Sequence, residues 1–163
     1  MPEIEEKAAA VAARLQARGE SVAVAESSAG GLISAALLAV PGASAYFKGG
    51  VTVYTGASKT LFLGLGPERM AQVRAATEAH ALDLAQAARA ALGADWGVGE
   101  TGAAGPTGNR YGDPPGHSCI GVAGPVQGSC VCATGQSHRG DNMRAFALEA
   151  LDLLHELLRR ADD

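Results

Sequence analysis

Residues 21–40 read Ser21-Val-Ala-Val-Ala-Glu-Ser-Ser-Ala-Gly-Gly-Leu-Ile-Ser-Ala-Ala-Leu-Leu-Ala-Val40, and this stretch decides the fold class. The apolar run Ser21–Ala25 predicts a short buried strand. The polar residues Glu26–Gly31 predict a glycine-containing turn, and Leu32–Val40, which precedes Pro41-Gly42, predicts a helix. A buried strand that leads through a turn directly into a helix is typical of an α/β fold.

The rest of the chain continues this alternation of elements. Apolar periodicity predicts helices at 2–18, 57–63, 67–73, 77–92 and 141–160, and strands at 50–54, 94–100, 118–123 and 129–134. Helices on both sides of a few short strands predict a three-layer α/β/α sandwich around a small mixed sheet. A length of 163 residues fits one domain, so we predict a single domain spanning residues 1–163.

The composition excludes several classes of protein. Hydrophobic residues make up 47% of the chain, which is enough apolar material for a core and excludes extended disorder. The formal net charge of -4 and the aromatic content of 4% disfavour a nucleic-acid partner. The uncharged stretch 27–47 contains several glycines and serines as well as Pro41, so we expect no membrane span.

The cysteines and the N-terminal residues indicate the cellular compartment, and the histidines indicate whether a metal is bound. The three cysteines are an odd number, and Cys130-Val-Cys132 has neither metal-knuckle nor CxxC spacing, so we expect reduced thiols. The acidic start Met1–Glu6 lacks the basic region of a signal peptide, and we expect a cytoplasmic location. The four histidines form no ligand cluster, so we predict no metal and no other cofactor.

The first candidate site is the turn at the end of the first strand. It places Ser27 and Ser28 at the start of a helix, where free N–H groups can hold an anion or an oxyanion. Gly30 and Gly31 permit close approach of a ligand to the backbone. The alternative is that a serine simply caps the helix.

The second candidate is Lys59, one of only three lysines in the chain. It follows a strand end, where open α/β sheets place their ligands. A lysine desolvated there could lose its proton near neutral pH and act as the base for a serine. The alternative is a solvated surface lysine.

The third candidate is the glycine-rich segment Thr101–Arg110, which offers backbone N–H groups and polar side chains to a ligand. The alternative is a loose surface loop. A further candidate for ligand binding is the pair Arg139 and Arg144 at the start of the last helix, which could hold one phosphate. The alternative, that these arginines belong to a solvated helix start, explains them equally well.

Three motifs occur in one order along essentially the whole chain. Ala25–Gly31 resembles the AES-x-T-GG turn of the CinA C-terminal domain family, also called the nicotinamide-nucleotide amidase family. Val53–Lys59 is similar to the Y-S-N-x-x-K segment of that family, and Thr101–Pro106 is similar to its TG-x-AGP loop. Pro115-Gly116 and the closing helix fit the family's later elements.

The resemblance implies a stand-alone domain that hydrolyses the carboxamide of nicotinamide mononucleotide, giving nicotinate mononucleotide and ammonia in pyridine-nucleotide salvage. The family's motif serine, lysine and tyrosine fall on Ser27, Lys59 and Tyr54. On this basis Ser27 attacks the amide carbon and neutral Lys59 takes its proton, without a metal. Tyr54 positions these two groups or the ring.

The resemblance also implies a set of substrate-binding residues for a small-molecule nucleotide. N–H groups around Ala29–Gly31 would hold the oxyanion, the glycine loop would grip the nucleotide, and an arginine would bind the phosphate. We expect the protein to form a homo-oligomer. The predicted binding residues are Glu26, Ser28, Ala29, Gly30, Gly31, Thr101, Gly102, Gly105, Arg139 and Arg144.

The sequence departs from the family pattern at a few positions. Ala29 and Gly56 stand where the family usually has Thr and Asn, Asn142 interrupts the usual pattern before the last helix, and Asn109–Pro115 forms a distinct segment. These departures keep other functions open. One is a non-catalytic nucleotide-binding or regulatory paralogue. Others are an oligomeric interaction domain and a hydrolase that acts on a different amide.

Overall fold

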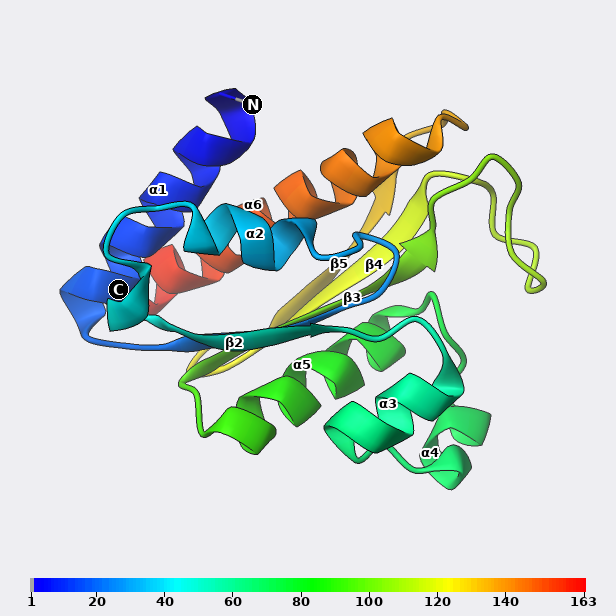
Figure 1. Ribbon diagram of the computed structural model, residues 1–163, viewed down its shortest axis with the longest axis horizontal. Coiled ribbons are helices and arrows are strands. Elements are labelled where there is room, and N and C mark those ends of the chain that lie inside the picture. The colour runs from blue at the N-terminus through cyan, green and yellow to red at the C-terminus, as the bar shows by residue number, and fades with distance from the viewer. Residues whose placement is uncertain (1) are drawn as a thin grey trace.

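Five strands form one mixed sheet in the order β2-β1-β3-β4-β5. They are β1 (Val22–Glu26), β2 (Phe47–Thr52), β3 (Trp96–Ala103), β4 (His117–Ala123) and β5 (Gly128–Ala133). β1 runs parallel to both β2 and β3, whereas β4 is antiparallel to β3 and to β5. The computed structural model describes residues 2–163 (Figure 1). Met1, where the predicted domain begins, lies outside the described residues.

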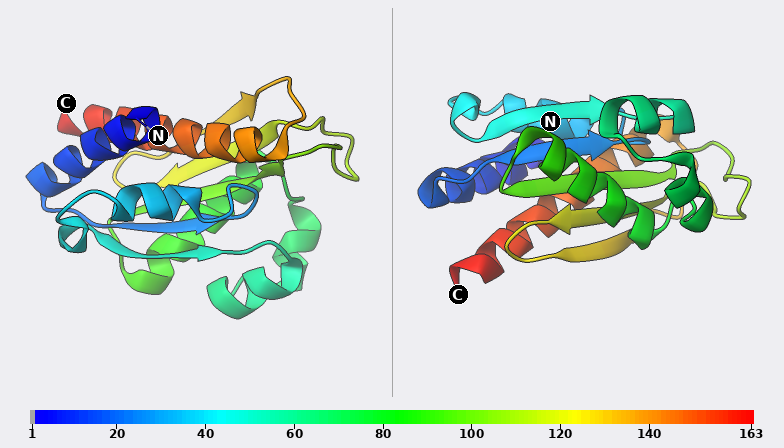
Figure 2. Two further views of the ribbon diagram at one scale, coloured as in Figure 1. Left: turned by 45° about the horizontal axis from the view of Figure 1, so that its top comes forward. Right: turned by 90° about the horizontal axis from the view of Figure 1, so that it is seen from below.

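Helices cover both faces of the sheet, which confirms the predicted three-layer α/β/α architecture (Figures 1 and 2). One face carries α1 (Pro2–Arg18), α2 (Leu32–Leu38) and α6 (Arg139–Asp162). The other carries α5 (Glu78–Leu92), with α3 (Gly56–Leu63) and α4 (Pro67–Gln72) beside it; a short 3-10 helix spans Ala43–Ala45. Within residues 2–163 no helix has the length and apolar character needed to cross a membrane.

The larger core lies between the sheet and the helices α1, α2 and α6. Burying these apolar faces supplies most of the stability, at about 25 cal/mol per Å² of apolar surface. On the other face α5 packs very close to β3, because Gly97 and Gly99 bring the strand against the backbone carbonyls of Ala85 and Ala81. A side chain at either glycine would collide with α5. The Gly97-Val-Gly99 pattern therefore serves helix packing.

Two strands differ from their predicted bounds, with consequences for the site. β2 begins at Phe47, earlier than the predicted residue 50, and it includes Gly49 and Gly50. These glycines weaken a strand pattern in the sequence, but Gly50 lets Ser34 of α2 pack directly on the strand. β3 extends to Ala103, past the predicted residue 100, so Thr101 belongs to the sheet and not to the glycine loop.

Candidate functional site

The parallel strands β1, β2 and β3 end together at one edge of the sheet (Figure 1). Their register places Glu26 beside Thr52 on one side and beside Glu100 on the other. The turn after β1 and the segment after β2 therefore start from the same edge, where open α/β sheets bind ligands. Ser27 begins the first of these segments, and Tyr54 lies in the second.

The carboxylate of Glu100 organises the turn that contains Ser27. Glu100 is fully buried and accepts hydrogen bonds from the N–H groups of Ser27 (3.0 Å) and Ala29 (2.8 Å). Its second oxygen accepts from the hydroxyls of Ser28 and Ser118, the latter at 2.7 Å. Burial raises the pKa of Glu100, and the four hydrogen bonds oppose that rise. The Glu100 carboxylate on β3 thus holds the Ser27 turn in one conformation.

Glu26 caps helix α2, and neither serine of the turn does so. Its carboxylate accepts from the N–H groups of Gly31 (2.8 Å), Ile33 (3.0 Å) and Ser34 (2.9 Å). A carboxylate at a helix N-terminus satisfies orphan donors and interacts well with the helix dipole. Glu26 is fully buried and its carboxylate is used in capping, so the alternative of serine capping is wrong, while the contact of Glu26 with substrate stays a prediction.

The N–H groups predicted to hold an oxyanion are already occupied. Those of Ala29, Gly30 and Gly31 donate to Glu100, to the Ser27 carbonyl (3.0 Å) and to Glu26, respectively. These N–H groups donate within the protein in this structure, and their binding of an oxyanion stays a prediction. Among the hydrogen bonds of residues 2–163, the Ser28 N–H has no partner, so Ser28 supplies the available donor of this turn.

Ser27 Oγ and Lys59 Nζ lack any hydrogen-bond or ion-pair partner among the described residues. Ser27 is 7% exposed and Lys59 is 6% exposed, yet neither polar atom is fully enclosed. A surface lysine, the alternative for Lys59, is excluded by this burial. Desolvation lowers the pKa of the Lys59 amine, and the nearby charge of Glu100 opposes the change. Lys59 therefore loses its proton more readily than a lysine in water.

Local capping fixes the direction of Lys59. Thr55 Oγ1 accepts from the Ser58 N–H (3.1 Å), and Ser58 Oγ accepts from the Thr55 N–H (3.0 Å), which forms a capping box at the start of α3. The helix that follows buries Lys59 while Leu61 and Phe62 stay exposed. The amine thus faces inward from a fixed first turn.

A cavity of about 470 Å³, the Lys59 cavity, lies between α3, α4, α5 and the loop after β3. It is in the size range of small-molecule sites. Its lining residues are Tyr54, Gly56, Lys59, Pro67, Met70, Ala71, Val73, Ala75, His80, Arg110 and Tyr111. The structure therefore brings the predicted residues Tyr54 and Lys59 together, whereas Ser27 does not line this cavity.

A smaller hollow of about 290 Å³, the Gly105 hollow, adjoins the same tyrosine. It is lined by Tyr54, Gly102, Ala103, Ala104, Gly105, Thr107, Gly108, Asn109 and Arg139. Arg139 donates to the Gly105 carbonyl (2.5 Å) and to the Tyr54 hydroxyl (3.3 Å). Tyr54 thus separates the two hollows and connects the start of α6 to the glycine loop.

A family model described as CinA C-terminal domain matches residues 4–158. This chain belongs to the CinA C-terminal domain family. It is 46% identical over 149 residues to a CinA-like protein of Anaeromyxobacter dehalogenans, covering 91% of this chain and 36% of that protein. A CinA-like protein of Thermosynechococcus vestitus is 40% identical over 155 residues, with 93% and 37% covered. The chain thus spans little more than a third of these relatives' length.

Solved structures of the CinA superfamily share the fold over nearly the whole chain. The competence/damage inducible protein CihA of Agrobacterium tumefaciens has a TM-score of 0.88 at 30% identity, covering 95% of both chains. A CinA superfamily protein of Klebsiella pneumoniae has a TM-score of 0.90 at 26% identity, covering 96% of this chain and 98% of its own. The five-stranded sandwich is therefore the architecture of this family.

Two residues assigned to the CinA-type site by sequence lie elsewhere. Thr101 is buried, its Oγ1 accepts from the Ala76 N–H (2.9 Å) and it lines neither hollow, so its contact with the nucleotide stays a prediction. Arg144 pairs with Asp141 (3.2 Å) on the exposed first turn of α6 and lines neither hollow. The alternative of a solvated helix start fits Arg144, whereas Arg139 does lie at the Gly105 hollow.

The glycine loop of this CinA domain is fixed by its own hydrogen bonds. Asn109 Oδ1 accepts from the N–H groups of Tyr111 (3.0 Å) and Asp113 (3.1 Å), and Asn109 Nδ2 donates to Asp113 (2.8 Å). Asp113 in turn pairs with Arg74 (2.8 Å), which anchors the loop to the segment before α5. The alternative of a loose surface loop is therefore wrong.

Sequence reasoning missed Glu100, His80, Arg110 and Tyr111. Glu100 is signalled by a carboxylate that follows the apolar run Trp96–Gly99 in a predicted strand, a group that must find donors when buried. His80 and the loop residues Arg110 and Tyr111 carry no such signal, because only the tertiary fold brings them to Lys59.

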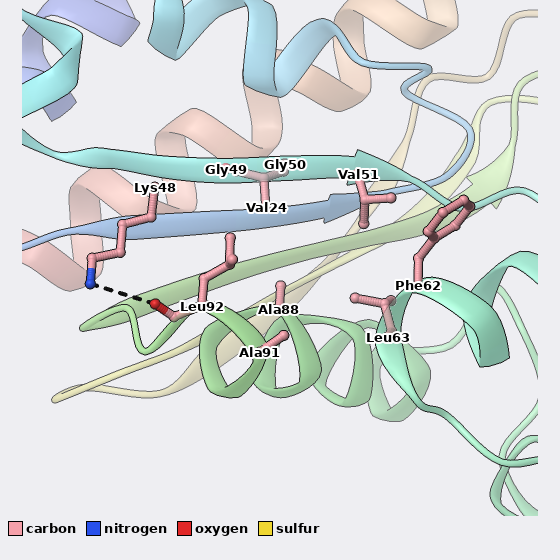
Figure 3. Close-up of a pocket in the computed structure, with 10 residues that line it drawn as sticks. All are labelled: Val24, Lys48, Gly49, Gly50, Val51, Phe62, Leu63, Ala88, Ala91 and Leu92. Atoms are coloured by element: carbon pink, nitrogen blue, oxygen red, sulfur yellow. Dashed lines mark hydrogen bonds between the residues drawn. The ribbon is translucent and has the colours of Figure 1, made fainter.

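An apolar hollow of about 330 Å³ lies between β2, α3 and α5 (Figure 3). Lys48 lines it, and its ammonium donates to the carbonyls of Leu92 (3.5 Å) and Gly93 (3.2 Å) at the end of α5. A cation at a helix C-terminus is a stabilising arrangement. This hollow contains none of the predicted site residues, so we place the candidate site at the Lys59 cavity.

No group of three or more His, Cys, Asp or Glu side chains is placed to hold a metal ion in the described part of the chain. Burial raises the pKa of Cys119 and of Cys132 to about 11, and that of Cys130 to about 12. These thiols therefore stay protonated near neutral pH and are weak nucleophiles.

Proposed function

We propose that this CinA domain is an amidase that hydrolyses the carboxamide of nicotinamide mononucleotide to nicotinate mononucleotide and ammonia. The observation that carries the proposal is a pair of buried, unpartnered groups, the Ser27 hydroxyl and the Lys59 amine, which share the neighbour Glu100. Membership of the CinA family supports it as well. A buried amine of lowered pKa is the kind of base that a Ser–Lys hydrolase needs.

In the proposed mechanism, Ser27 Oγ attacks the amide carbon while neutral Lys59 takes the hydroxyl proton. The tetrahedral oxyanion accepts a hydrogen bond from the Ser28 N–H, the donor left free by the turn. The C–N bond then breaks as the Lys59 ammonium gives its proton to the departing nitrogen, which leaves as ammonia. Lys59, neutral again, removes a proton from the water that attacks the ester. The bond between the acyl carbon and Ser27 Oγ then breaks, the Lys59 ammonium returns the proton to Oγ, and nicotinate mononucleotide leaves.

The remaining residues of the site have binding and positioning roles in this proposal. The phenol of Tyr54, held by Arg139, separates the two hollows and orients the ring of the substrate. Gly102 and Gly105 form the wall of the smaller hollow, where their backbone can approach the ligand. We further propose that the protein acts as a homo-oligomer in the cytoplasm, which sedimentation and cell fractionation would test.

The test is ammonia release from nicotinamide mononucleotide, with nicotinamide and the dinucleotide as matched substrates. We expect ammonia from the mononucleotide alone. We also expect the loss of at least about 100-fold in kcat for Ser27→Ala, since it removes the nucleophile. Ammonia from none of the three compounds would contradict the proposal.

One observation favours a second candidate function, a nucleotide-binding or regulatory protein without turnover. Four of the five N–H groups of Ser27–Gly31 are already engaged, and Ala29 adds no hydroxyl to the site. An oxyanion would then have a single backbone donor. Calorimetric binding of the mononucleotide without any ammonia release would select this function over the amidase.

A further inference from the structure

The Lys59 cavity has a permanently charged side chain in its lining, Arg110, although the chain is acidic overall. Lys59 and Arg110 line it, and no described residue in its lining carries a carboxylate. Glu100 lies behind the Ser27 turn and is fully buried, so it does not face this cavity. Because a low-dielectric wall strengthens the field of fixed charges, such a cavity favours an anionic ligand.

Arg110, like Lys59, has no acidic partner among residues 2–163. Two other arginines close to the cavity are neutralised, Arg69 by Asp83 (2.7 Å) and Arg74 by Asp113 (2.8 Å). Arg110 instead donates to the Tyr111 hydroxyl (2.8 Å), and its guanidinium lies 4.9 Å from the centre of that ring. Most of its N–H donors therefore remain available for a ligand.

Arg110 is exposed, and the ring of Tyr111 restricts its guanidinium through the hydrogen bond and the ring contact. The guanidinium of Arg74 also lies over the Tyr111 ring, 4.8 Å from its centre. Arg74 also binds Asp113 through two nitrogens (2.8 and 3.3 Å), which ties the loop to the cavity wall. A preorganised guanidinium loses little conformational entropy when it binds, and its planar fork matches phosphate oxygens.

His80 is an independent sign that the cavity receives a polar ligand. It lines the cavity from α5 at 2% exposure, and its Nε2 is the one buried side-chain atom without a hydrogen-bond partner in the described residues. Burial lowers the pKa of His80 to about 4, with the Lys59 charge acting in the same direction, so the ring is neutral near pH 7. An unpartnered buried nitrogen destabilises the protein, and a ligand that bonds to it offsets that cost.

We propose that the Lys59 cavity binds the phosphate-bearing part of the substrate and that Arg110 is the residue that binds its phosphate. This inference rests on the proposed function and specifies the substrate class of the same site: an amide that carries a phosphomonoester. Arg139 is the competing anchor, but its guanidinium already holds the Gly105 carbonyl and the Tyr54 hydroxyl. Arg110 thus acts as a specificity determinant for phosphorylated substrates.

The kinetic test compares nicotinamide mononucleotide with its dephosphorylated riboside in Arg110→Gln, Arg139→Gln and Arg159→Gln. Charge-assisted hydrogen bonds are worth about 1.5–3 kcal/mol, so Arg110→Gln should raise the KM for the mononucleotide about 10- to 100-fold. The KM for the riboside should not change. Arg159, which pairs with Glu156 on the outer surface of α6, is the matched control and should leave both values unchanged.

A binding measurement separates failure of this inference from failure of the proposed function. Ribose 5-phosphate is titrated calorimetrically into the wild-type chain and the same variants, with folding of each checked by the fluorescence of buried Trp96. Binding that is lost in Arg110→Gln supports the inference even if no variant releases ammonia. Absence of wild-type binding, or a loss confined to Arg139→Gln, would overturn it.

Discussion

Replacement of Glu100 by Ala should destabilise the protein by an amount that the hydrogen bonds of the Ser27 turn define. Three buried donors depend on this carboxylate alone: the N–H groups of Ser27 and Ala29 and the hydroxyl of Ser28. The hydroxyl of Ser118 has a second acceptor, the Thr101 carbonyl at 3.3 Å. At about 1–3 kcal/mol for each unsatisfied donor, the sum is about 3–9 kcal/mol.

Water can enter the space that the carboxylate leaves and satisfy part of this deficit, so we expect about 3–5 kcal/mol. That is a large share of the 5–15 kcal/mol that typically stabilises a domain. Glu100→Gln should cost only about 1 kcal/mol, because the amide oxygen can still accept from both N–H groups. Its NH2 group can donate to the hydroxyls of Ser28 and Ser118, which rotate to accept.

Urea unfolding followed by the fluorescence of the single tryptophan, Trp96, measures both variants. Glu6→Ala on the exposed face of α1 is the matched control and should leave the unfolding midpoint in place. Equal destabilisation by Ala and Gln at position 100, or a cost below about 1 kcal/mol for Ala, would refute the idea that Glu100 organises the turn.

Three further predictions follow from the buried amine and the glycine loop. Lys59→Met should raise the free energy of unfolding at pH 7, because folding lowers the Lys59 pKa and the unfolded chain therefore binds more protons. The difference in unfolding free energy between Lys59→Met and wild type should narrow as the pH rises toward 10.5. Urea titrations at several pH values would measure this difference. Glu100→Gln removes the charge that opposes this lowering, so the acid limb of the pH profile of kcat/KM should move to lower pH; a limb that stays in place would argue against Lys59 as the base. Gly105→Ala should lower the free energy of unfolding, measured in urea, by more than about 2 kcal/mol, because φ is +112° and a Cβ would lie 2.7 Å from the Ser137 carbonyl oxygen. Gly112→Ala is the matched comparison, since its φ is +91° but no atom lies within 4 Å of the added Cβ. It introduces only backbone strain and should lower the free energy of unfolding by less.

The sequence predicts those elements that local pattern determines. The helix Pro2–Arg18 and the helix that Thr77 caps have clear periodicity and terminal residues, and the structure has both, with Thr77 Oγ1 accepting from the His80 N–H. The strand around residue 50 was placed too late, because glycines that permit close packing look like strand breakers in a sequence. Local sequence patterns do not show which helix will pack against a strand.

The site was predictable only in part for a related reason. Ser27, Tyr54 and Lys59 follow strand ends and belong to recognisable motifs, so the sequence singled them out. The role of Glu26 as a helix cap was open to prediction, since it stands just before a helix, yet its buried contacts were not. The meeting of His80 with Arg110 at one cavity depends on tertiary packing between segments 30 residues apart, which no motif encodes.

The most direct test of the central claim is a comparison of two adjacent serines. Ammonia release from nicotinamide mononucleotide is measured for Ser27→Ala and Ser28→Ala, with folding of both confirmed by Trp96 fluorescence. We predict that Ser27→Ala loses turnover entirely, while Ser28→Ala, which removes a hydroxyl bound to Glu100 but not the nucleophile, retains a reduced rate. Turnover by Ser27→Ala at the level of Ser28→Ala or above would contradict the assignment of Ser27 as the nucleophile.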